Sequence, residues 1–122
     1  MSERVLRAVR GAITVDEDTA EAIGEGTSEL VRAVLERNLL DTEDIVSMIF
    51  TATPDLSADF PAASARRLGL ASVPLICAQE IPVAGAMARC IRVMVHCYAP
   101  RSRPVRHVYL REARQLRTDL PE

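Results

Sequence analysis

The sequence contains no lysine, so all fifteen of its basic side chains are arginine. It also lacks tryptophan, and an aromatic content of 3% supplies few of the stacking platforms that single-stranded nucleic acids require. With a net charge of only −2, we expect no nucleic-acid partner. The apolar stretches are too short to span a membrane, and the charged first residues do not form a signal peptide. We therefore expect a cytoplasmic protein with no membrane contact.

Cysteine and histidine are too few for a disulfide framework or a metal centre. Cys77, Cys90 and Cys97 are odd in number and form no CxxC pair, and only two histidines accompany them. We therefore expect no metal site. The sequence has neither a glycine-rich phosphate loop nor a spacing of serine, histidine and aspartate that suggests a triad. The chain thus offers cations but no evident nucleophile.

What the sequence does contain is one domain of 122 residues, 48% of them hydrophobic, with an uneven distribution of charge. Residues 16–44 carry ten acidic side chains against two arginines, and residues 101–117 carry six arginines against one glutamate. The basic segment is either a solvated face or the rim of an anion-binding site. We treat residues 1–122 as a single domain whose polar tail, residues 113–122, is expected to be mobile.

Hydrophobic periodicity predicts an α+β fold with a mixed sheet. Strands are expected at residues 4–14, 45–53, 73–80, 90–98 and 105–110, with a loop between the third and fourth. A long helix is predicted from a capping box at Asp18 and Glu21 to about Asn38, with Gly24 and Gly26 weakening its first turns. A short helix is predicted with Asp59 as N-cap, Pro61 in its first turn and Gly69 at its end.

The predicted strands are apolar on both faces, and one long helix cannot cover both. We therefore expect other copies of the chain to cover the second face, in a closed oligomer.

Several arginines interrupt these apolar strands. Arg10, Arg92 and Arg106 each lie among valines, and a guanidinium in such a place needs an anionic partner. Alternation in the fourth strand places Ile91, Val93, Val95 and Cys97 in the core and directs Arg92 to the other face. The pattern predicts a pocket for a small polyanion, because guanidinium groups bind carboxylates and phosphates bidentately. The alternative is a structural Arg92, paired with Glu80 or Asp55.

The neighbouring candidates also allow two interpretations. Arg7 and Arg10 lie on opposite faces of the first strand, and periodicity does not say which is functional. Glu80 can accept a hydrogen bond from a substrate or pair with an arginine, and the residues alone favour the pairing. Tyr109 is either a donor to a carboxylate or an amphipathic core residue. Cys77, in an apolar strand, is expected to be inert packing.

Six segments together resemble the AroH class of chorismate mutases. They are RAVRGAITVDEDT, FTATPDLSADFPAASARRLG, VPLICAQEIPV, CIRVMVH, VRHVYLREA and LRTDL, and they run in order over nearly the whole chain. The resemblance implies a homotrimeric pseudo-α/β-barrel with active sites between subunits. It implies rearrangement of chorismate to prephenate, a step toward phenylalanine and tyrosine, without cofactor, metal or covalent intermediate.

The resemblance also implies residue roles. Arg10 and Tyr109 would hold the side-chain carboxylate, Arg92 would face the ether oxygen, and Glu80 would accept a hydrogen bond from the ring hydroxyl. The implied substrate-binding residues are Leu75, Ile76 and Cys77 near Glu80, Phe60 and Arg66 from the neighbouring subunit, and Leu116 and Arg117 from the tail. Three positions depart from the family pattern: Ala63 on the short helix, Ile76 in the third strand and Thr118 in the tail.

Two other functions compete with this one. A small trimeric imine or enamine deaminase has a similar size and also uses an arginine for a carboxylate, but its characteristic arginine-bearing segment is not evident in this sequence. A non-catalytic carboxylate-binding module would use the same arginines for a regulatory ligand.

Overall fold

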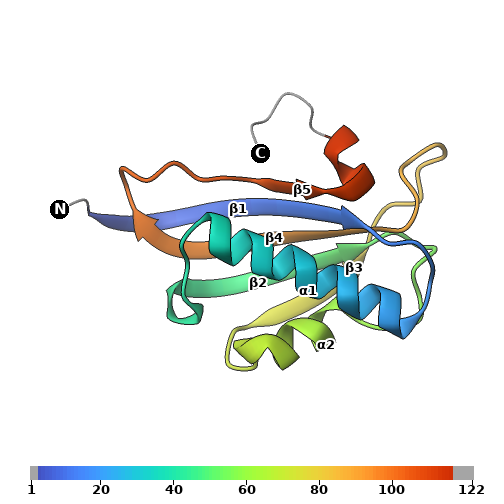
Figure 1. Ribbon diagram of the computed structural model, residues 1–122, viewed down its shortest axis with the longest axis horizontal. Helices are drawn as coiled ribbons and strands as arrows, with labels where there is room; N and C mark the ends of the chain where they lie inside the picture. The colour runs from blue at the N-terminus through green and yellow to red at the C-terminus, as the bar shows by residue number, and fades with distance from the viewer. Residues whose placement is uncertain (1–2, 117–122) are drawn as a thin grey trace.

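The protein folds around one five-stranded mixed sheet that carries helices on one face. The computed structural model describes residues 3–116, and Figure 1 shows how their elements are arranged. The sheet order is β3-β2-β4-β1-β5, in which β4 is antiparallel to β1 and β2, while β5 and β3 run parallel to β1 and β2 respectively. The strands are β1 (Arg4–Thr14), β2 (Ile45–Ala52), β3 (Leu75–Gln79), β4 (Cys90–Pro100) and β5 (Val108–Leu110).

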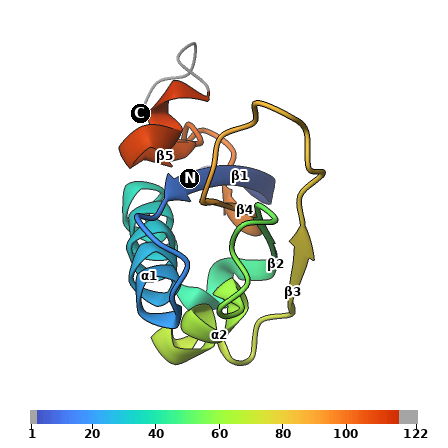
Figure 2. The same ribbon diagram turned by 90° about the vertical axis from the view of Figure 1, so that its right-hand side faces the viewer.

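The helical elements are one long helix, one short helix and three short turns. They are α1 (Ala20–Arg37), η1 (Thr42–Asp44), α2 (Pro61–Ala65), the π-helical turn η2 (Arg66–Leu70) and the 3-10 helix η3 (Arg111–Gln115). Figure 2 shows α1 packed along one side of the sheet with α2 beside it. The predicted α+β fold, with a mixed sheet and one long and one short helix, is therefore confirmed.

The core lies between α1 and the sheet. Ile91, Val93, Val95 and Cys97 are all buried there, so the alternation predicted for β4 is confirmed. Gly11 permits the close packing of α1, because a Cβ at this position would lie 3.0 Å from Cδ1 of Leu30.

Gly26 has a similar role on the helix itself. A Cβ there would lie only 2.5 Å from Cγ1 of Val15. The helix therefore includes a residue of low helix propensity where its backbone must approach Val15 closely.

Both predicted N-caps were wrong by one residue. Helix α1 is capped by Thr19, whose Oγ1 accepts the Ala22 N–H at 3.0 Å. The Asp18 carboxylate instead accepts the N–H groups of Ser57 and Ala58, at 2.9 and 3.0 Å, which fixes the loop before α2. The carboxylate that the capping-box pattern predicted as the cap of α1 is therefore bound by this loop instead.

Helix α2 begins after Phe60 rather than after Asp59. Phe60 is the N-cap residue, and its own N–H donates to the Asp59 carboxylate at 2.7 Å. Pro61 occupies the first turn as expected, and Gly69 adopts the positive φ of 94° that a chain reversal at the end of this segment requires.

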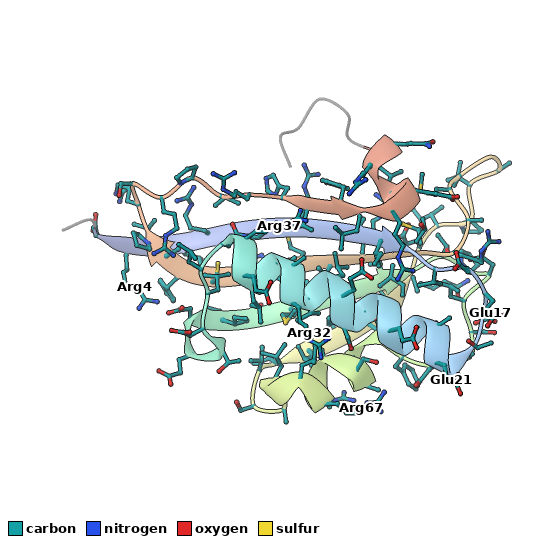
Figure 3. The ribbon with its side chains drawn as sticks, viewed as in Figure 1. Arg4, Glu17, Glu21, Arg32, Arg37 and Arg67 are labelled. Carbon is teal, nitrogen blue, oxygen red and sulfur yellow. The ribbon has the colours of Figure 1, made fainter. Side chains whose placement is uncertain are left out.

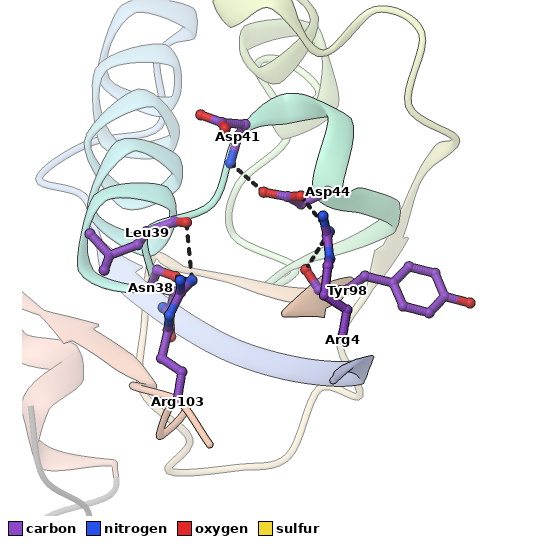
Figure 4. A network of polar contacts seen from close by, with 7 residues as sticks. All are labelled: Arg4, Asn38, Leu39, Asp41, Asp44, Tyr98 and Arg103. Carbon is purple, nitrogen blue, oxygen red and sulfur yellow. Dashed lines mark hydrogen bonds and ion pairs between the residues drawn. The ribbon is translucent and has the colours of Figure 1, made fainter. Parts of the chain in front are cut away.

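A network of polar contacts fixes the end of α1 (Figure 4). The predicted end near Asn38 is confirmed, since Asn38 is the C-cap. Nη1 of Arg103 donates to the carbonyls of Asn38 and Leu39, at 3.1 and 3.2 Å, which satisfies acceptors left open at the helix end. Nearby, Nη2 of Arg4 donates to Asp44 and to the Tyr98 carbonyl.

Strand β5 begins at Val108, three residues later than predicted. The backbone N–H and C=O of Arg106 bond to the Asn38 side chain at 2.8 and 2.9 Å instead of joining the sheet. Strand β1 has the predicted ends, residues 4 and 14, whereas β2, β3 and β4 differ from their predicted ends by one or two residues. After β5 the chain continues into η3, where Ala113 is buried, so residues 113–115 of the predicted tail have helical structure.

The two faces of the sheet are covered unequally. Among residues 3–116, the face opposite α1 is covered only at the end beneath η3, where Ala12, Cys90, Tyr109 and Ala113 form a second buried cluster. Elsewhere on this face large apolar side chains are exposed, among them Leu6 at 57%, Ile76 at 62% and Tyr98 at 47%. Within residues 3–116, this face of the sheet is therefore apolar but largely uncovered, as expected if one long helix cannot cover both faces.

Charged side chains lie on the outer surface of the helical layer. Glu21, Arg32 and Arg37 of α1 and Arg67 of η2 are exposed (Figure 3). Within residues 3–116, no helix is both long enough and apolar enough to cross a membrane.

Candidate active site

A pocket opens on the sheet face that lies opposite α1, and two of the strand arginines line it. Its volume is about 260 Å³, and we call it the first pocket. It brings together side chains from β1, β2, β4, β5 and the segment after η3. The lining residues are Arg10, Gly11, Ile49, Thr51, Arg92, Val93, Met94, Tyr109 and Leu116.

Arg92 forms an ion pair at the edge of this pocket. Its Nε lies 3.1 Å from Oε2 of Glu80, and the Arg92 side chain remains 47% exposed. Oε2 of Glu80 also accepts a hydrogen bond of 2.6 Å from Oγ1 of Thr51. Of the two partners considered for Arg92, the structure selects Glu80. The Asp55 carboxylate instead accepts from Oγ1 of Thr53 and from the backbone N–H of Arg89.

The structure also distinguishes the two arginines of β1. Nη1 of Arg7 donates to the carbonyls of Arg101 and Arg103, on the helix-covered side. Arg10 lies on the opposite side and lines the first pocket. Its backbone N–H donates to Nδ1 of His107 at 3.0 Å, just before β5 begins to pair with β1. Arg7 is therefore structural, and Arg10 is the arginine available to a ligand.

Tyr109 and Leu116 form the wall of the pocket near η3. Tyr109 is 8% exposed, pairs in register with Ala12 and belongs to the second buried cluster, against which Leu116 packs. Burial raises the pKa of the nearby Cys90 thiol to about 11, so little of the nucleophilic thiolate forms there at neutral pH. Within residues 3–116, no group of histidine, cysteine and acidic side chains is arranged to hold a metal ion.

A second pocket, of about 410 Å³, lies at the β3 edge of the sheet and contains other predicted site residues. Phe60 and Cys77 line it. Cys77 pairs in register with Phe50, a buried residue of the helix-covered face, whereas Thr51 of the first pocket pairs with Ala78. Within one chain the predicted residues thus fall into two separate groups.

The remaining predicted residues lie outside both pockets. Leu75 is half-buried against the main core, Ile76 is exposed on the face opposite α1, and Arg66 is exposed on η2. Ala63 is half-buried in α2. Arg117 and Thr118 lie beyond the described residues.

Sequence reasoning did not identify Thr51 or Met94 as pocket residues. The pairing of β2 with β4 indicates both residues, because it places Thr51 opposite Arg92 and Ile49 opposite Met94. Finding them required the pairing of two strands that are about forty residues apart, and periodicity within one strand does not give that pairing.

These features define a class of small α+β protein in which two arginines line a pocket on one face of the sheet and one of them pairs with a carboxylate. The family model for chorismate mutase type I matches residues 6–120, so the chain belongs to the chorismate mutase type I family.

Individual relatives agree with this assignment. The chain is 50% identical over 119 residues to chorismate mutase AroH of Thermus thermophilus, covering 95% of this chain and 97% of that protein. It is 44% identical over 119 residues to chorismate mutase AroH of Bacillus subtilis (strain 168), covering 95% and 93%. The solved chorismate mutase from Clostridium thermocellum superposes with a TM-score of 0.86 at 44% identity, covering 89% of this chain and 98% of that chain.

The protein is accordingly a chorismate mutase, which converts chorismate to prephenate in aromatic amino acid biosynthesis. The deaminase and the non-catalytic binding module are thereby set aside.

Proposed function

We propose that the rearrangement takes place in the first pocket and that Arg92, Glu80, Arg10 and Tyr109 carry it. The observation that carries this proposal is the Arg92–Glu80 pair, with its 3.1 Å contact at the rim of a pocket also lined by Arg10. Chorismate has two carboxylates, an ether oxygen and a ring hydroxyl. Two guanidinium groups, one carboxylate and one phenol match that set of groups.

Each residue then has a distinct role. Arg10 and Tyr109 hold the side-chain carboxylate, and Glu80 accepts a hydrogen bond from the ring hydroxyl. These contacts select the compact conformer in which the two reacting carbons meet, which removes an entropic part of the barrier. Arg92 faces the ether oxygen, where negative charge increases as the C–O bond breaks. A fixed cation there binds the transition state more tightly than the substrate, so it accelerates the reaction itself.

The active form in this proposal is a homotrimer whose sites lie between subunits. Three observations support it. The predicted residues divide between the first pocket, with Arg92, and the second pocket, with Phe60. The sheet face opposite α1 leaves large apolar side chains exposed. The first pocket, at about 260 Å³, is also smaller than the roughly 300–1,000 Å³ of typical ligand sites. A neighbouring subunit that supplies Phe60 and Arg66 would complete it.

Subunit complementation tests the shared site. Arg92→Ala and Arg66→Ala should each be inactive alone. When the two are mixed, unfolded and reassembled, about one site in four combines both intact residues on random assembly of a trimer, and activity should return to that extent. Arg67→Ala is the matched control for position 66, because Arg67 donates to Ser64 and lies outside both pockets.

Two results would contradict the shared site. One is a mixture that stays inactive although it reassembles into trimers. The other is an active monomer in sedimentation velocity. A spectrophotometric assay of chorismate consumption without added cofactor supplies the activity readout for all variants.

We also propose that the enzyme is cytoplasmic. The three cysteines are free thiols, which suits a reducing compartment such as the cytoplasm.

A further inference from the structure

Glu80 must present a defined oxygen to the substrate, although it comes just after the end of a strand. Its backbone N–H donates to the Ala52 carbonyl at 2.9 Å, which fixes the main chain but leaves the side-chain torsions free. The Arg92 contact alone is a weak restraint, because the Arg92 side chain is 47% exposed. The carboxylate needs a second contact, and Oγ1 of Thr51 supplies it at 2.6 Å.

We propose that Thr51 is a positioning residue that fixes the rotamer of Glu80 and, through it, the orientation of Arg92. This inference rests on the proposed roles of Glu80 and Arg92. Thr51 suits the task because it lies on β2 directly between the two, paired in register with Arg92 on one side and with Ala78 on the other.

Both contacts of the Glu80 carboxylate use the same oxygen. Nε of Arg92 and Oγ1 of Thr51 both approach Oε2, and among residues 3–116 Oε1 accepts no hydrogen bond. Oε1 is therefore the oxygen that would accept the substrate hydroxyl.

The threonine hydroxyl also limits how Glu80 and Arg92 can pair. A carboxylate and a guanidinium left to themselves favour a bidentate pair in which both oxygens are used. That pair would take Oε1 away from the substrate and a terminal nitrogen of Arg92 away from the ether oxygen. By holding Oε2 between two donors, Thr51 favours the single contact to Nε and leaves the remaining groups for the reaction.

The test compares two substitutions that differ in one hydroxyl group. Thr51→Val keeps the shape and the strand propensity of threonine but removes the donor, whereas Thr51→Ser keeps the donor. We expect T51V to lower kcat/KM about tenfold, as for a lost hydrogen bond to a charged group, and T51S to stay within about twofold of wild type. Circular dichroism and sedimentation should show folded, assembled protein in both cases.

A double-mutant cycle with Glu80→Gln separates this inference from the function on which it rests. In an E80Q background, T51V should lower kcat/KM by less than about twofold, because the carboxylate that Thr51 positions is gone. The role of Thr51 would be overturned if T51V lowered kcat/KM equally in the wild-type and E80Q backgrounds. It would also be overturned if T51S were as impaired as T51V. An E80Q variant with wild-type kinetics would instead overturn the proposed role of Glu80 and the Thr51 inference with it. An impaired E80Q with a fully active T51V would overturn only the inference.

Discussion

Nε of Arg92 lies 3.1 Å from Oε2 of Glu80 across the neighbouring strand β2. This contact gives Arg92 the structural partner that the sequence allowed, and Arg92 also lines the first pocket, as the proposed ligand-binding role requires. The pair stabilises each charge near an apolar sheet, and the contact is made by Nε of the guanidinium. In the proposed mechanism the same guanidinium also serves the anionic substrate, so one ion pair would both hold the cation in place and orient it.

Arg92 should be the residue on which catalysis depends most. Replacing it with citrulline, a neutral side chain of nearly the same shape, should lower kcat by about 100- to 1,000-fold, as when a donor to a developing oxyanion is lost. Arg92→Lys should recover only part of this, because lysine lacks the planar fork that serves Glu80 and substrate together. Steady-state kinetics on folded, assembled variants measure the effect, and a citrulline variant with near-normal kcat would contradict the assignment.

The cysteines should take no part in the chemistry. Burial raises the pKa of Cys90 to about 11 and also raises the pKa of Cys97, so very little thiolate forms at either position at pH 8. Iodoacetamide should therefore modify Cys77, the exposed thiol, before the other two, as read by mass spectrometry of the native protein.

Cys77→Ser should keep substantial activity, since a unimolecular rearrangement needs no covalent intermediate. Complete loss of activity with an intact assembly would argue for a covalent mechanism instead.

The elements that the sequence predicted well are those determined by local periodicity. The period-2 pattern of CIRVMVHC placed Val93 in the core and Arg92 on the other face, and both are so placed. The presence of Arg10 and Arg92 in one pocket did not follow from either strand alone. It depends on the antiparallel register of β1 and β4, which places Ala12 opposite Arg92.

The predictions were wrong where a residue forms a hydrogen bond with a group that is distant in the sequence. Asp18 has the right spacing to cap α1, yet residues 57–58 bind its carboxylate. Residues 105–107 have a strand pattern, yet the backbone of Arg106 forms its hydrogen bonds with the Asn38 side chain. Such long-range hydrogen bonds leave no periodic signal in the sequence, so only the folded chain reveals them.

The Asp18 contact predicts a pH-dependent contribution to stability. Hydrogen bonds from the backbone of Ala58 and Ser57 lower the pKa of Asp18 below its ordinary value of 3.8. A pKa lowered by folding means stabilisation that is present above the unfolded-state value and lost as the pH falls through the folded-state value. Asp18→Asn should therefore be less stable than wild type at pH 7, and the difference should shrink toward pH 3.

Urea denaturation measures the free energy of unfolding of wild type and Asp18→Asn at pH 7 and at pH 3. The protein concentration is kept fixed, because assembly links stability to concentration. An equal difference at both pH values would show that the negative charge of Asp18 is not what stabilises the loop.

The C-terminal tail should contribute more to substrate capture than to chemistry. Residues 117–122, with Arg117, lie outside the described part of the chain, but the residue before them is placed at the first pocket. Leu116 lines that pocket and packs against the cluster that contains Tyr109. A truncation after Ala113 would therefore disturb Tyr109 as well, and the informative truncation ends at Leu116.

Removal of residues 117–122 should raise KM by about fivefold or more and change kcat by less than about twofold, because contacts made equally to substrate and transition state affect mainly KM. The effect should be modest, since ordering a tail on binding offsets part of the contact energy gained by Arg117. A truncation after Thr118, which retains Arg117, is the matched control and should have near-wild-type kinetics. If KM stays unchanged while kcat collapses, Arg117 acts on the transition state and the tail belongs to the catalytic centre.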